Sequence, residues 1–122
     1  MQVYERKYLR VHYQQEIELE TTSRLKLQAC AENISMGGLG MTCDRITAQE
    51  MVPMGYQLNH EPSLRLSVRL TLDDTTIVVT CGIQNSFRLA ENSYSFNLKF
   101  IALEQANLQL LENFIQKQGK AS

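Results

Sequence analysis

Two arginines and a short polar segment are the residues of this chain whose types and spacing favour ligand binding. Arg6 and Arg10 lie four residues apart near the start of the sequence. Arginine presents a planar fork of donors that pairs with phosphate oxygens, and it also stacks on flat rings. Asn33 and Ser35 lie two residues apart, so their side chains point the same way on an extended segment. An isolated arginine pair is typical of a solvated surface, but the two elements together predict a site for phosphates and purine edges.

The segment around Asn33 and Ser35 also holds an unusual number of glycines. It reads ENISMGGLGM over residues 32–41, with three glycines within four residues. One interpretation is a tight turn that needs a positive φ. The other is a backbone that a polar ligand approaches closely, because glycine has no Cβ in the way.

Candidates for catalysis and metal binding are few. The only histidines are His12 and His60, and neither has a paired nucleophile or a ligand at metal-binding spacing. Cys30, Cys43 and Cys81 lie far apart without a CxxC pattern, and their odd number argues against a disulfide framework. We therefore expect no enzyme, no catalytic residue and no metal site, and reduced, mostly buried thiols.

Length and charge exclude several other classes. A chain of 122 residues favours one domain, here residues 1–122. The net charge is −1 and the sequence shows no basic stripe, so we expect no DNA or RNA partner. No segment is apolar for long enough to cross a bilayer, and the first ten residues lack the apolar run of a signal peptide. We predict a cytoplasmic protein without membrane insertion.

Hydrophobic periodicity predicts an all-β protein with one terminal helix. Apolar residues alternate with polar ones, which is typical of strands, in residues 11–19, 25–31, 39–43, 64–72, 77–83 and 94–100. The segment 44–59 shows no period, and we interpret it as irregular. After Phe100 the spacing changes to three and four, which predicts a helix that Gly119 ends as a C-cap. Six short strands indicate a closed barrel or a sandwich that the helix covers.

The residues carry a resemblance to one family. RKYLR at Arg6–Arg10 followed by NISMGG at Asn33–Gly38 resembles the paired RxxxR and [D/N]xSxxG signature of PilZ domains. The order of strands and the terminal helix also resemble that family over nearly the whole chain. The resemblance implies an arm at residues 1–10, a six-stranded antiparallel β-barrel at 11–101 and a capping helix at 102–118.

The family's function gives specific expectations. PilZ domains are bacterial receptors for cyclic di-GMP, so the resemblance implies this ligand and no other cofactor. Arg6 and Arg10 would contact phosphate and guanine, and Asn33 and Ser35 would read guanine edges. Gly38 would leave room for the ligand.

The resemblance implies a stand-alone, non-enzymatic receptor that relays the nucleotide signal to an unidentified protein partner. The alternative is an interaction module on the same fold that does not bind the nucleotide. Asn97 bears on this choice, because it stands where the family often has a glycine in its last strand. At that position Asn97 would either crowd the ligand or add a hydrogen bond.

Overall fold

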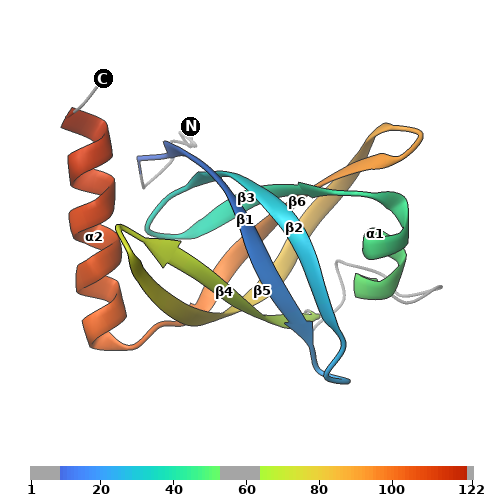
Figure 1. The fold of residues 1–122 in the computed structure, drawn as a ribbon, viewed down its shortest axis with the longest axis horizontal. Coiled ribbons are helices and arrows are strands. Elements are labelled where there is room, and N and C mark those ends of the chain that lie inside the picture. Colours follow the sequence, from blue (N-terminus) through green and yellow to red (C-terminus); the bar gives the residue numbers. More distant parts are fainter. Residues whose placement is uncertain (1–8, 53–63, 121–122) are drawn as a thin grey trace, which may run out of the picture.

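The computed structural model describes residues 9–52 and 64–120 of the chain. In this part the chain forms six strands and two helices (Figure 1). The strands are β1 (Val11–Thr21), β2 (Lys26–Ile34), β3 (Gly38–Cys43), β4 (Arg65–Leu72), β5 (Thr75–Ala90) and β6 (Ser93–Ala102). The helices are α1 (Arg45–Met51) and α2 (Gln105–Lys120).

The six strands close into one antiparallel barrel. Their order around it is β1-β2-β3-β6-β5-β4, and the pairing of β1 with β4 closes the ring. This confirms the expected six-stranded barrel and decides against a two-sheet sandwich. Closure leaves these strands without an open edge, which is the usual solution for small all-β domains. The far end of the β5–β6 hairpin projects beyond the barrel (Figure 1).

The alternating residues of the strands fill the interior, as their period predicts. In β4, Leu66, Val68, Leu70 and Leu72 are buried, and they alternate with more exposed residues. Gln15 interrupts the same pattern in β1 and is exposed. The register of β1 against β2 shifts between His12 and Gln15, so the polar residue is accommodated at an irregularity.

The turn between β4 and β5 forms at two consecutive aspartates. Asp73 and Asp74 have φ angles of 48° and 71°, so both are in the left-handed region. Two consecutive positive φ values are the mark of a two-residue hairpin turn that matches the twist of the strands. Aspartate tolerates this conformation better than most residues, and the pair is explained as a turn rather than as paired catalytic carboxylates.

Helix α1 lies within the segment expected to be irregular, and this expectation was wrong for residues 45–51. Asp44 caps the helix: its Oδ1 accepts a hydrogen bond of 2.8 Å from the Thr47 N–H. This bond lowers the pKa of the Asp44 carboxyl. Ala48 and Met51 bury one side of the helix. The sequence does contain a helix-start pattern, an aspartate at the N-cap followed by helix-compatible residues. The nearby Pro53 and Gly55 favoured an irregular segment instead.

Helix α2 covers one side of the barrel, opposite α1 (Figure 1). Its buried residues are Leu111, Phe114 and Ile115, and the Phe114 ring meets the Tyr13 ring edge to face at 5.5 Å. The exposed ammonium of Lys117 pairs with Asp73 at 2.7 Å. No helix within residues 9–52 and 64–120 is both long and apolar enough to cross a bilayer.

Gly119 does not end α2, contrary to expectation, because the helix includes it and extends to Lys120. An added Cβ at Gly119 would lie 3.1 Å from the Leu9 side chain. The glycine therefore allows the residue before Arg10 to approach the helix closely. The glycine is therefore part of the helix and not its C-cap, and an alanine here would need only a small shift of the exposed Leu9 side chain.

Candidate ligand-binding site

The turn between β2 and β3 is built around Ser35. The Ser35 N–H donates to the Gly38 carbonyl at 2.8 Å, and the Ser35 hydroxyl lies 3.4 Å from the same oxygen. The Gly37 N–H donates to the Ser35 hydroxyl at 3.1 Å. Only 4 % of Ser35 is exposed. The hydroxyl therefore holds the turn in shape, and its expected contact with guanine stays a prediction.

Gly38 is required by the sheet itself. A Cβ at this position would overlap the carbonyl oxygen of Leu98 on β6. The turn is also attached to β6 by a 2.9 Å hydrogen bond from the Phe100 N–H to the Gly37 carbonyl. Gly38 does not have a left-handed φ, so close approach of two backbones is the reason for glycine here. Its expected contact with a ligand stays a prediction.

Arg10 and Asn33 meet, although they are 23 residues apart in the sequence. The Arg10 guanidinium donates a hydrogen bond from Nη1 to Oδ1 of Asn33. Both side chains are partly buried. Arg6 lies outside the described residues. The structure thus brings together one residue from each half of the motif pair, at the start of β1 and the end of β2.

Gly40 provides the space that Asn33 occupies. The two residues are direct partners between β2 and β3, and a Cβ on Gly40 would lie 3.0 Å from Oδ1 and 3.1 Å from Nδ2 of Asn33. The amide of Asn33 therefore lies over a bare stretch of β3 backbone. Gly40 was not among the predicted site residues, although it belongs to the same glycine cluster.

A polar row continues across the outside of the barrel from Asn33. Gly40 pairs with Asn97 on β6, and Asn97 pairs with Asn85 on β5. Direct partners in a sheet point to the same face, and both neighbours of Asn97 in the chain, Phe96 and Leu98, are buried. Asn97 Nδ2 donates to Asn85 Oδ1 at 2.8 Å. Asn85 could not be identified from its place in the sequence, because only the strand register puts it beside Asn97.

The thiols of the barrel are poorly suited to nucleophilic chemistry. Burial raises the pKa of Cys81 to about 12. Burial, followed by the neighbouring Asp44 carboxylate, raises the pKa of Cys43 to about 11. Cys30 is half-buried, and all three cysteines are unpaired. Within residues 9–52 and 64–120 there is no cluster of three His, Cys, Asp or Glu side chains suited to a metal ion.

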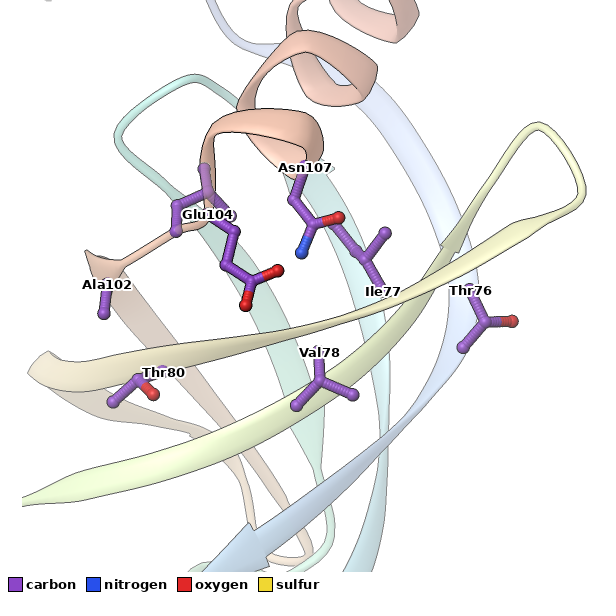
Figure 2. Close-up of a pocket in the computed structure, with 8 residues that line it drawn as sticks. Thr76, Ile77, Val78, Thr80, Ala102, Glu104 and Asn107 are labelled. Atoms are coloured by element: carbon purple, nitrogen blue, oxygen red, sulfur yellow. The ribbon is translucent and has the colours of Figure 1, made fainter.

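One hollow of the described chain lies away from the predicted residues. It has a volume of about 560 Å³ and lies between β5 and the start of α2. Glu104 and Asn107 reach into it from the α2 side, above Val78 of β5 (Figure 2). The Glu104 carboxylate would repel a ligand with phosphates. We therefore place the candidate nucleotide site on the Arg10–Asn33 face and not in this hollow.

Sequence comparison gives no relative for this chain. It matches no protein-family profile, and no curated protein is significantly similar to it. Any evidence on its kinship therefore comes from the fold.

Solved structures with the same fold do exist. The MrkH–c-di-GMP complex of K. pneumonia superposes with a TM-score of 0.71 at 12 % identity, covering 98 % of this chain and 57 % of MrkH. The inhibitor of motility MotI/DgrA of Bacillus subtilis gives 0.67 at 19 % identity, with 98 % and 54 % covered. This chain thus spans little more than half the length of either protein.

One of the similar structures is itself a single domain. The PilZ domain of YcgR from Escherichia coli, solved with c-di-GMP, gives a TM-score of 0.67 at 9 % identity. The alignment covers 97 % of this chain and 94 % of that domain. Identities this low establish the architecture alone. The chain described here therefore has the fold of a PilZ domain.

Proposed function

We propose that this protein is a receptor for cyclic di-GMP that acts by binding and not by catalysis. The observation that carries the proposal is the contact of Arg10 with Asn33, which joins the RxxxR and NxSxxG segments on one face of a PilZ fold. A guanidinium beside a side-chain amide offers donors for phosphate oxygens and both donor and acceptor for a base edge. Two structures with this fold, the PilZ domain of YcgR and MrkH, are complexes with c-di-GMP.

Each motif residue has a role in this proposal. Arg6 and Arg10 contact phosphate and guanine. Asn33 reads a guanine edge, and Ser35 holds the turn that orients Asn33. Gly38 keeps β3 close to β6, so that the turn stands at a fixed position on the barrel.

The relay to a protein partner has a candidate route at the start of β1. Leu9 lies next to Arg10 in the chain, and its side chain lies against Gly119 of α2. Ligand contacts that move Arg10 would thus also move a residue whose side chain lies beside the terminal helix. We propose that the changed surface, around α2 and the start of β1, is what a cytoplasmic protein partner recognises.

A second candidate is a PilZ-fold interaction module that does not bind the nucleotide. Asn97 favours it, since its side chain stands on the outer face of β6 next to Gly40. If the amide fills the space that a ligand needs, binding is lost while the fold remains. The two candidates make opposite predictions for one titration.

Isothermal titration with cyclic di-GMP tests the proposal. We expect saturable binding by the unaltered protein, and a loss of about tenfold to hundredfold in affinity for Arg10→Ala, because a charge-assisted hydrogen bond is removed. Arg88→Ala is the matched control, since Arg88 is exposed and its side chain donates to the Ala90 carbonyl in the β5–β6 hairpin. Absence of binding in a folded sample would favour the interaction module.

A further inference from the structure

Another hollow lies at the far end of β1 from the Arg10–Asn33 contact. Arg10 directly precedes β1, whereas this hollow lies where β1 ends and turns into β2 (Figure 1). It has a volume of about 530 Å³. Two arginines, Arg24 and Arg65, line it together with hydroxyl-bearing residues of the turn, β4 and β5. The hollow therefore combines cationic groups with small hydrogen-bond donors.

The strand register explains how hydroxyl groups come to line this hollow. Ser67 on β4 is the direct partner of Glu20 on β1 and of Thr80 on β5. Direct partners point to the same face of a sheet, and both chain neighbours of Ser67, Leu66 and Val68, are buried. This row therefore faces outward. The hydroxyls of Ser67 and Thr80 make no hydrogen bond to any other described residue.

The two arginines of the hollow differ from a third arginine nearby. Arg65 and Arg69 are exposed positions on the same face of β4. Arg69 pairs with the Glu18 carboxylate at 3.3 Å. Neither Arg65 nor Arg24 forms an ion pair with another residue in the part of the chain that the structure describes. Their guanidinium donors are therefore available to an anion.

Arg24 is also held in a backbone conformation that is unusual for arginine. Its φ is 70°, in the left-handed region that glycine and asparagine occupy most easily. Thr21 holds the turn: its carbonyl accepts from the Arg24 N–H at 2.9 Å, and its N–H donates to the Leu25 carbonyl at 3.0 Å. The Thr21 hydroxyl also accepts from the Leu25 N–H at 3.1 Å. A side chain kept at an energetically costly position indicates a use for that side chain.

Glu20 is the one carboxylate that lines the hollow, and it opposes an anion. Its direct partner on β2 is Lys26, and opposite charges at such positions offset one another. Three cationic side chains, Arg24, Lys26 and Arg65, thus stand against one carboxylate. The charge around the hollow remains positive.

We propose that this hollow binds a phosphate group, which Arg24 and Arg65 contact while the hydroxyls of Ser67 and Thr80 donate hydrogen bonds to it. A phosphate monoester carries up to two negative charges and three acceptor oxygens, and a guanidinium pairs with two such oxygens at once. A phosphorylated side chain of a protein partner and free inorganic phosphate present this same chemistry. The inference goes beyond the proposed function, because it holds whether or not the protein binds cyclic di-GMP.

A residue-resolved NMR titration of the full chain with sodium phosphate tests the site, with sodium chloride at equal ionic strength as the reference. We expect saturable shifts of the backbone amides of residues 22–25, 67 and 80 with phosphate alone. Arg65→Ala should weaken phosphate binding by about tenfold, because a charge-assisted contact is removed. Arg69→Ala, the matched control, should weaken it by less than about twofold. No saturable shifts, or equal effects of the two variants, would overturn the inference.

Arg24→Gly separates a binding role from a structural one. Glycine adopts the left-handed conformation without the steric cost that arginine carries. We therefore expect a midpoint of thermal unfolding equal to or above that of the unaltered protein, together with a loss of about tenfold in phosphate affinity. Unchanged phosphate binding, or a lowered midpoint, would contradict the role of Arg24.

A short alanine peptide with one central phosphoserine distinguishes the two sources of phosphate. We expect it to shift the same amides and to bind at least as tightly as inorganic phosphate, since the hollow opens to the surface. Weaker binding than inorganic phosphate would assign the site to the free anion. Equal binding of the unphosphorylated peptide would overturn the inference. A failure to bind cyclic di-GMP would overturn the proposed function and leave these results unaffected.

Discussion

Gly38 and Gly40 are adjacent outward positions of β3, but the structure places different demands on them. At Gly38 the space beside the α-carbon is filled by backbone of β6. At Gly40 it is filled by the end of the Asn33 side chain. A backbone atom cannot move without opening the sheet, whereas an amide can rotate away. Glycine at position 38 is thus needed for the fold, whereas glycine at position 40 leaves room for the Asn33 side chain of the candidate site.

The two glycine-to-alanine variants should therefore separate stability from binding. We expect Gly38→Ala to lower the free energy of unfolding by about 3 kcal/mol, at the upper end of the usual cost of overpacking. Gly40→Ala should cost less than about 1 kcal/mol but weaken cyclic di-GMP binding by displacing Asn33. Urea denaturation measures the first effect and calorimetric titration the second. Similar losses of stability in both variants would contradict this explanation.

Cys81 should make the fold sensitive to alkali. Burial raises its pKa to about 12 in the folded protein, against about 8.5 in an unfolded chain. Between these values the unfolded chain releases a proton that the folded protein retains. The free energy of unfolding therefore falls as pH rises, by about 1 kcal/mol between neutral pH and about pH 9.5.

Urea denaturation of the unaltered protein and of Cys81→Ala at the two pH values checks this contribution. Cys43 and Tyr13 titrate in both proteins, so the difference between them isolates Cys81. We expect the decline to be smaller in the variant by about 1 kcal/mol. Parallel pH dependence of the two proteins would show that Cys81 does not contribute.

At the scale of elements, the sequence pattern predicted the strands, the turns and the terminal helix that depend on neighbouring residues. The strand pairs on either side of Asp73 and Asp74 and the apolar face of α2 follow from alternation, turn residues and helical spacing. Helix α1 was missed because a seven-residue helix leaves little periodic signal, and its Asp44 cap stood among residues typical of loops. The prediction that Gly119 ends the helix was wrong, because a glycine near the end of a helical pattern can also lie inside the helix, as it does here.

The candidate site was predictable in its chemistry but not in its geometry. The motif halves could be recognised from their spacing, and the structure adds that Arg10 contacts Asn33. The pairing of Asn97 with Gly40 and Asn85 depends on β3 lying beside β6, a contact between distant segments. The pairing of β5 with β6 also shifts register, for example between Ile83 and Asn85. Such neighbours therefore cannot be predicted from the alternation of apolar and polar residues.

Helix α2 should contribute strongly to stability through one side chain. Phe114 is buried against the barrel and meets Tyr13 edge to face. We expect Phe114→Ala to lower the free energy of unfolding by about 3–5 kcal/mol, as large aromatic truncations do. Asn113→Ala, at an exposed position of the same helix, should change it by less than about 0.5 kcal/mol. Urea denaturation of both variants tests whether the helix is an integral part of the fold.

At the scale of the whole molecule, a closed barrel gives the site a rigid base. Four adjacent strands, β2, β3, β6 and β5, present Asn33, Gly40, Asn97 and Asn85 in one row. Because hydrogen-bonded strands fix their lateral spacing, the side chains need little reorganisation to meet a ligand. The contact of Leu9 with Gly119 joins this face to α2, where a change on binding could be read by a partner.

The central claim is that cyclic di-GMP binds at the Arg10–Asn33 face of this barrel. A residue-resolved NMR titration of the folded protein with cyclic di-GMP tests both the binding and its place. We predict saturable shifts of the backbone amides of residues 33–40 and of the side-chain amides of Asn33 and Asn97, with little change around the hollow at Glu104. Shifts centred on that hollow, or none at a large excess of nucleotide, would contradict the account.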